Sequence, residues 1–195
     1  MRDPVGVILA GGLGRRIGGS KAKVELGGRP LISYPLAALG AVLSNVAVIA
    51  KPSTELPALP GVTVWVESAA PSHPLVGIIE ALGLAGGRPV VVCAVDLPFV
   101  TPALISSLAG TDPLGAPAVV AAHGDEIQPL LGCYQPAAGR LLAGMDGRFE
   151  RPVRETVAAI GPRTFEVDDP ELLFNINSPY DVLQAAAMLD RLSRT

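Results

Sequence analysis

Two long, uninterrupted apolar runs constrain the fold of this chain most strongly. Residues 5–10 and 89–95 are rich in β-branched side chains and carry no charge. A strand with apolar residues on both sides is buried on both faces, as in a parallel sheet that is covered by helices. Longer Ala- and Leu-rich segments separate these runs from several shorter ones. The sequence therefore predicts an α/β protein.

The alternation of strand-like and helix-like segments continues along the whole chain. Thr101 and Ser178 each precede a proline, the pattern of an N-cap followed by proline in the first helical turn. Repeated strand–helix–strand units indicate one sheet with helices on both faces, and no linker divides residues 1–195, so we expect a single domain. Strands are predicted at residues 5–10, 46–50, 62–66, 89–95, 118–122, 130–134 and 164–167, and helices at 31–43, 75–84, 102–108, 136–144, 153–159 and 178–192.

Composition excludes several classes of protein. With 49% hydrophobic and 17% charged residues the chain is not disordered, and its net charge of −3 argues against a generally basic nucleic-acid binder. Cys93 and Cys133 lie within apolar runs, which predicts reduced, buried thiols. The uncharged segment 30–50 is as long as a membrane-spanning helix, but proline, glycine and polar residues divide it into a helix and a strand. We expect a soluble, cytoplasmic protein.

A glycine-rich segment directly after the first strand is the strongest functional signal. Residues 9–21 read Leu-Ala-Gly-Gly-Leu-Gly-Arg-Arg-Ile-Gly-Gly-Ser-Lys. Glycines leave backbone N–H groups uncovered, and the cations add positive charge, so the segment suits a polyphosphate. Ile17 rules out the dinucleotide fingerprint, and Ser20 before Lys21 rules out the P-loop. The alternative is a flexible surface turn, which the placement of two of the three lysines here disfavours.

Asp96 ends the predicted central strand and is the only charged residue between Arg88 and Asp112. A carboxylate in such apolar surroundings usually caps a backbone, pairs with a cation or binds a metal. Because the carboxyl ends of parallel strands meet at one edge of a sheet, Asp96 is expected to face the glycine-rich segment. We interpret it as a Mg²⁺ ligand, with capping of the turn at residues 97–99 as the alternative.

Weaker signals come from polar residues elsewhere. Alternation places Asn175 and Asn177 on one face of an extended segment, where their amides could bind a ligand or complete a metal shell. The alternative is a purely structural turn before the Ser178 cap. His73 is expected to be a surface turn residue without a partner. A basic cluster that either receives an acidic substrate or forms a solvated face consists of Arg148, Arg151 and Arg154.

Together these motifs resemble the nucleotidyltransferase family that includes the molybdenum cofactor guanylyltransferases (MobA). The resemblance extends over nearly the whole chain and is carried by residues 9–12, 15–21, 26–31, 74–77, 95–99 and 175–179. Three positions depart from the family pattern. The aspartate before the motif lysine is missing, Ile49 or Lys51 replaces an asparagine after the second strand, and Glu67 stands in place of an aspartate.

The resemblance implies a three-layer α/β/α, Rossmann-like, mostly parallel sheet of the nucleotide-diphospho-sugar transferase type. It implies transfer of GMP from Mg·GTP to the phosphate of molybdopterin, with contacts to proteins that deliver or receive the cofactor, and without nucleic acid or membrane. By the same resemblance, Gly12 lies against the base, Arg16 and Lys21 hold phosphates, and Asp96 holds Mg²⁺. The remaining implied contacts are the nucleotide-binding Leu9, Ala10, Gly11, Glu67, Pro74 and Gly77 and the acceptor-binding Asn175 and Asn177.

Two alternatives to this reading remain at this point. One is the same chemistry with CTP or with another small phosphorylated acceptor. The other is a nucleotide-binding regulatory domain without turnover, which the presence of both Asp96 and Lys21 disfavours.

Overall fold

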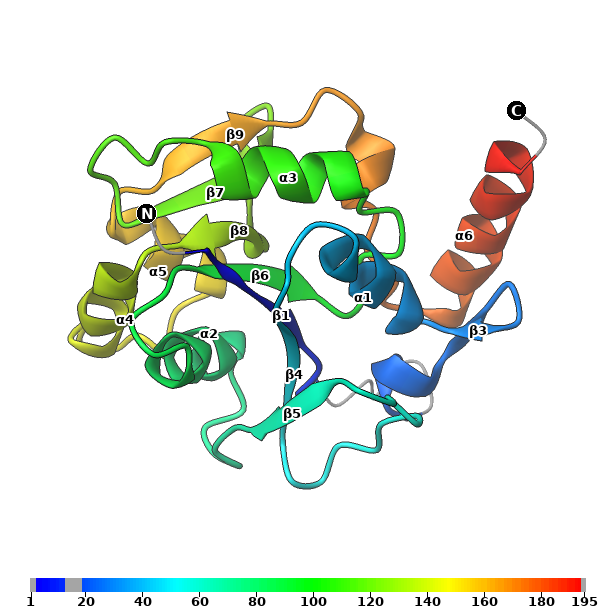
Figure 1. Cartoon of the computed structure of the whole chain (residues 1–195), viewed down its shortest axis with the longest axis horizontal. Coiled ribbons are helices and arrows are strands. Elements are labelled where there is room, and N and C mark those ends of the chain that lie inside the picture. The colour runs from blue at the N-terminus through cyan, green and yellow to red at the C-terminus, as the bar shows by residue number, and fades with distance from the viewer. Residues whose placement is uncertain (1–2, 13–18, 194–195) are drawn as a thin grey trace.

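A computed structural model describes residues 3–12 and 19–193, and within them the chain forms a seven-stranded sheet flanked by helices (Figure 1). The sheet order is β5-β4-β1-β6-β8-β7-β9, and a separate small hairpin consists of β2 and β3. The strands are β1 Val5–Leu9, β2 Glu25–Leu26, β3 Arg29–Pro30, β4 Val46–Ala50, β5 Thr63–Val66, β6 Val90–Ala94, β7 Ala118–His123, β8 Glu126–Tyr134 and β9 Arg163–Glu166. The helices are α1 Ser33–Gly40, α2 Pro74–Leu84, α3 Pro102–Gly110, α4 Pro136–Ala143, α5 Val153–Ala159 and α6 Pro179–Leu192, with 3₁₀ turns η1 Lys21–Lys23 and η2 Pro170–Leu173.

The central strand β1 lies between β4 and β6 and is parallel to both. The chain leaves β1 toward β4 and β5, and then crosses to the other side of β1 to form β6. The winding therefore reverses between β1 and β6, and in α/β sheets ligands bind in the crevice outside the carboxyl ends of the strands at such a point. The amide of Val95 donates to the carbonyl of Leu9 at 3.2 Å, which holds these two carboxyl ends side by side.

The strand β8 runs antiparallel between β6 and β7, an arrangement that the sequence did not predict. β7 and β8 form a tight hairpin in which His123 pairs with Glu126, and Gly124 adopts a φ of 57° in the turn. An apolar run indicates that a strand is buried, but it carries no information on strand direction. The remaining paired strands, β4 with β5 and β7 with β9, are parallel, so the expected mostly parallel α/β sheet is confirmed.

Two apolar layers cover the sheet. Leu39 of α1 and Ile105 of α3 pack on one face, and Ile78 of α2, Leu142 of α4 and Val157 of α5 pack on the other. Most of these side chains are fully buried, because both faces of the central strands are apolar. The helix α6 instead packs beside the β2–β3 hairpin, over a third cluster of Leu26, Leu31, Phe99, Ile176, Ala185 and Met188 (Figure 1).

The predicted caps are present in the structure. The hydroxyl of Thr101 accepts a hydrogen bond from the amide of Leu104 at 3.2 Å, and Ser178 forms a capping box with Asp181. Cys93 and Cys133 are buried and free, as expected. Among the described residues, no helix combines the length and apolar character needed to cross a membrane.

Candidate active site

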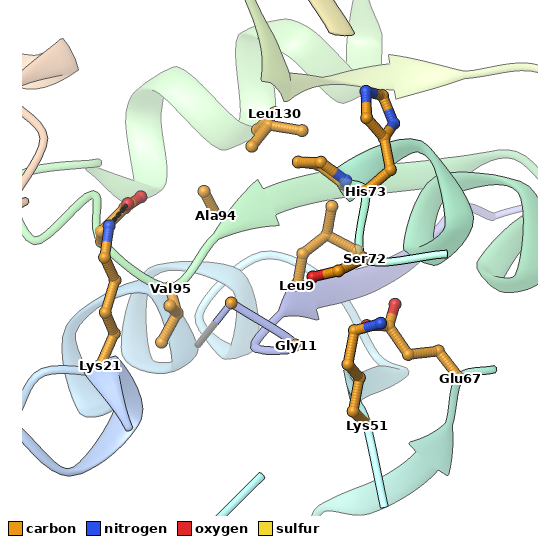
Figure 2. Close-up of a pocket in the computed structure, with 13 residues that line it drawn as sticks. Leu9, Gly11, Lys21, Lys51, Glu67, Ser72, His73, Ala94, Val95 and Leu130 are labelled. Atoms are coloured by element: carbon orange, nitrogen blue, oxygen red, sulfur yellow. Dashed lines mark hydrogen bonds and ion pairs between the residues drawn. The ribbon is translucent and has the colours of Figure 1, made fainter. Parts of the chain in front are cut away.

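A cavity of about 280 Å³ opens where β1 and β6 end (Figure 2). The glycine turn after β1 forms part of its wall, and Asp96 after β6 forms another part. The expectation that these two features face one space is therefore confirmed. The complete lining consists of Leu9, Gly11, Gly12, Lys21, Lys51, Glu67, Ser72, His73, Pro74, Ala94, Val95, Asp96 and Leu130.

One end of the cavity is built around the ammonium group of Lys21. Its Nζ donates to Asp96 Oδ2 at 2.6 Å and to Asn177 Oδ1 at 2.7 Å. The amide of Ile176 donates to the carbonyl of Asp96 at 3.0 Å, so a backbone hydrogen bond brings the asparagine segment to the end of β6. Residues from the first, middle and last parts of the chain thus meet at one point.

Asp96 has the free coordination capacity that a metal ion requires. Its Oδ2 pairs with Lys21, whereas its Oδ1 is buried and has no hydrogen-bond partner among the described residues. The side chain therefore does not cap the turn that follows, which was the structural alternative. The described residues contain no cluster of three or more His, Cys, Asp or Glu that could hold a metal. A single carboxylate with an unpartnered oxygen fits Mg²⁺, which proteins commonly hold through one or two carboxylates together with substrate phosphates and water.

The opposite end of the cavity contains a second pair of charged side chains, Glu67 and Lys51 (Figure 2). Both are buried, with exposed fractions of 5% and 7%. Lys51 Nζ donates to three backbone carbonyls in the loop before α2, those of Ser68, Ala69 and Pro71, at 3.3, 2.8 and 3.3 Å. The lysine therefore holds the loop that forms this wall.

Two glycines make room for the carboxylate of Glu67. A Cβ atom on Gly11 would meet Glu67 Oε1, and a Cβ on Gly77 would lie 2.7 Å from Glu67 Oε2. No larger residue fits at either position unless Glu67 moves. Glycine is thus required at residues 11 and 77 for a steric reason, which is separate from loop flexibility.

The pKa of Glu67 is raised above the ordinary value of a glutamate. Burial is the main cause, the positive charge of Lys51 opposes it, and the negative charge of Glu80 adds to it. A carboxylate in water-poor surroundings destabilises the folded state in its charged form. Ionisable side chains with shifted pKa values are concentrated at functional sites, because the chemistry of the site needs them in spite of their cost in stability.

His73 is not the unpartnered surface residue that we expected. Its Nδ1 accepts a hydrogen bond from the amide of Leu75 at 3.2 Å and caps α2, and its Nε2 lies 3.1 Å from the carbonyl of Arg151. The ring also meets Phe149 edge to face at 5.8 Å. A neutral imidazole that is protonated at Nε2 accepts a hydrogen bond at Nδ1 and donates one at Nε2, so this form of the ring satisfies both contacts. Both nitrogens are therefore already used by the fold.

Leu130 enters the cavity because of an irregularity in β8. The pairing of β7 with β8 jumps from Val120–Gly132 to Ala121–Gln128, so β8 has extra residues at this place. Leu130 consequently lies above Ala94, between His73 and the end of β6 (Figure 2). No sequence signal marks this position, since the bulge depends on how two distant segments pair.

The remaining candidates differ in where they lie. Leu9 and Pro74 line the cavity directly, whereas Ala10 lies in the apolar core and Gly77 lies against Glu67. Asn175 uses its amide locally, donating to the carbonyl of Leu173 at 2.9 Å. Arg16 lies outside the described residues. Within the described residues, the cavity wall includes none of the basic cluster of Arg148, Arg151 and Arg154.

The chain is similar in sequence and structure to known nucleotidyltransferases. Residues 6–160 match the family model of the MobA-like NTP transferase domain. The molybdenum cofactor guanylyltransferase of Cereibacter sphaeroides is 34% identical over 190 residues, which cover 94% of this chain and 96% of that protein. The probable molybdenum cofactor guanylyltransferase of Chloroflexus aggregans is 31% identical over 196 residues, covering 94% of each. The crystal structure of molybdopterin-guanine dinucleotide biosynthesis protein A from Archaeoglobus fulgidus has a TM-score of 0.75 at 24% identity and covers 96% of this chain and 99% of that chain.

Proposed function

Because this chain belongs to the MobA-like NTP transferase family and is a nucleotidyltransferase, we propose that it transfers GMP from GTP to the phosphate of molybdopterin. The observation that carries the proposal is the single cavity lined by Gly11, Gly12, Lys21 and Asp96. We assign the reaction to one domain formed by all 195 residues.

In this reaction an oxygen of the acceptor phosphate attacks the α-phosphorus of GTP. A new P–O bond forms while the bond from the α-phosphorus to the bridging oxygen breaks, and pyrophosphate leaves with the electron pair. The acceptor is already anionic, so no general base is required. This agrees with the structure of His73, whose two ring nitrogens are both engaged in hydrogen bonds.

The main barrier is the repulsion between several negative charges, and the residues at the Lys21 end of the cavity counter it. Lys21 would bind the phosphates, with Arg16 as a further cation, and Gly12 would lie against the base. Asp96 would hold Mg²⁺, which when bound neutralises charge on the phosphates and fixes their geometry. Asn177 and Asn175 would face the acceptor, molybdopterin.

The Glu67 end of the cavity supports guanine as the base. A carboxylate only accepts hydrogen bonds, and the N1–H and N2–H₂ groups of guanine present two adjacent donors to it. Cytosine presents only one donor group on this edge, N4–H₂, beside the acceptors N3 and O2, so it cannot offer a carboxylate two adjacent donor groups. Lys51 does not compete for the base, because its ammonium group is already bonded to three carbonyls.

Replacing Glu67 by glutamine is expected to have opposite effects on binding and on stability. GTP affinity should fall about tenfold or more, because a hydrogen bond to a charged acceptor contributes roughly 1.5–3 kcal/mol. The folded state should become more stable at neutral pH. Burial raises the pKa of Glu67, so its contribution to stability is present at low pH and is lost as the pH rises through that raised value. The advantage of the variant should therefore grow with pH.

Calorimetric titration with GTP and CTP, combined with melting temperatures over a series of pH values rising from the ordinary glutamate pKa of 4.5, measures both effects. Glu55→Gln is the control, because Glu55 is exposed and pairs with Lys23 outside the cavity. Unchanged preference for GTP over CTP in the Glu67 variant would contradict the assignment of the base.

The proposed function is tested by measuring pyrophosphate release from GTP and from CTP, each with and without molybdopterin. Release that requires both GTP and molybdopterin supports the proposal. Release with CTP instead identifies the cytidylyl reaction, and binding of GTP without release under any condition identifies a regulatory domain. We place the reaction in the cytoplasm, where GTP is available, with transient contacts to proteins that deliver or receive the cofactor.

A further inference from the structure

The ammonium group of Lys21 occupies one of the two carboxylate oxygens of Asp96 and leaves only the buried Oδ1 for another cation. It lies 2.6 Å from Asp96 Oδ2 and 2.7 Å from Asn177 Oδ1, distances that leave no space for another ion on the same side of these oxygens. The side chains of Lys21 and Asp96 are only 16% and 15% exposed. Their charges are therefore weakly screened by water. In this state the site is neutralised by its own lysine.

The backbone segments that carry these two oxygens are anchored by hydrogen bonds, whereas Lys21 reaches them through a longer side chain. Asp96 is held by the hydrogen bond from Ile176, and the amides of Asn177 and Ser178 both donate to Asp181 Oδ2 at 2.8 Å. Asn177 therefore directly precedes the capped start of α6, and its backbone has little conformational freedom. Lys21 reaches the site through a flexible four-carbon chain, which is the part of this cluster with the most rotational freedom.

A divalent cation and the Lys21 ammonium cannot share Asp96 without strong repulsion. Lys21 would have to leave, but a poorly exposed ammonium group without a counter-ion is costly. A triphosphate in the cavity removes this difficulty, because its oxygens offer Lys21 a new partner.

Building on the proposed function, we infer that Lys21 is a resident counter-ion that keeps divalent metal off Asp96 until a nucleotide arrives. The phosphates draw Lys21 away from Asp96, and the carboxylate then becomes available to the metal. Metal and nucleotide consequently bind together, and the enzyme without nucleotide has little affinity for metal. Lys21 thereby sets the order of binding in addition to its contact with the phosphates.

The test is binding of Mn²⁺ alone to the nucleotide-free protein, followed by electron paramagnetic resonance or calorimetry. Lys21→Met keeps the apolar length of the side chain and removes its charge, and it should bind Mn²⁺ at least about tenfold more tightly than the natural sequence. Lys21→Gln should behave in the same way and serves if the first variant is poorly folded. Lys23→Met is the matched control, because Lys23 pairs with exposed Glu55, and its affinity should stay unchanged. Adding Asp96→Asn to Lys21→Met should abolish the gain.

The inference is overturned if both Lys21 variants bind Mn²⁺ no more tightly than the natural sequence, or if the gain survives in the double variant. Circular dichroism confirms that the variants are folded. Failure of the proposed function would be seen in a different experiment. The unmodified protein would then release no pyrophosphate from any nucleotide. Mn²⁺ binding in the absence of nucleotide does not depend on that outcome.

Discussion

Replacing Asp96 by asparagine is expected to lower the rate of nucleotidyl transfer by roughly a hundredfold or more, the range found when one electrostatic stabiliser of a transition state is removed. Asparagine has the size of aspartate and can still accept the hydrogen bond from Lys21. It lacks the negative charge that would hold Mg²⁺, and its two polar atoms cannot both be acceptors. The loss should therefore appear in turnover, while the sheet around the residue stays intact.

The measurement is the initial rate of pyrophosphate release at saturating GTP and molybdopterin, with the circular dichroism spectrum as a check on folding. Asp125→Asn is the control, because Asp125 lies exposed in the turn between β7 and β8. Activity within a few-fold of the natural sequence in the Asp96 variant would remove Asp96 from the machinery, and with it the proposed metal site.

Replacing Gly11 by alanine is expected to reduce GTP affinity between about tenfold and a hundredfold. The new methyl group would overlap the carboxylate of Glu67, and Gly77 closes the other side of that carboxylate. Glu67 would have to leave the position from which we propose that it binds the base. Overpacking of this kind also destabilises a fold by roughly 1–3 kcal/mol, so the melting temperature should fall.

Two other glycines separate these effects. A Cβ on Gly12 meets no protein atom within 4 Å, so Gly12→Ala should leave stability unchanged and lower GTP affinity only through contact with the ligand. Gly83 lies in α2 with open space around it, and Gly83→Ala should be neutral for binding and stabilising by about 0.5–1 kcal/mol. Thermal unfolding and calorimetry on the three variants test this. Equal GTP affinity of Gly11→Ala and Gly83→Ala would contradict the role of Glu67.

Much of the fold could be predicted from the sequence because its signals are local. The apolar runs at β1 and β6 predicted central strands, and the Ser178 and Thr101 caps marked helix starts that the structure confirms. The meeting of the glycine turn with Asp96 followed from one general rule, that parallel strands end at the same edge of a sheet. The strands and caps depend on residues near one another in the chain, and the rule about strand ends then relates two distant segments.

Other features of the site could not be predicted because they depend on contacts between distant segments. The partner of His73 Nε2 comes from the loop before α5, and Leu130 reaches the cavity only through the bulge in β8. Lys51 had a weak signal, as one of only three lysines in the chain, but its three carbonyl partners depend on how the loop before α2 folds.

The sequence by itself determined which segments are buried as strands and which polar residues stand at their ends, because burial and capping are properties of neighbouring residues. Tertiary structure alone decided that β8 inserts antiparallel, that Glu67 fits between two glycines, and that Lys21 contacts both Asp96 and Asn177. The physical reason is that packing and charge pairing act through space. Lys21 and Asn177 are 156 positions apart in the chain, and only the folded sheet brings their side chains within hydrogen-bonding distance.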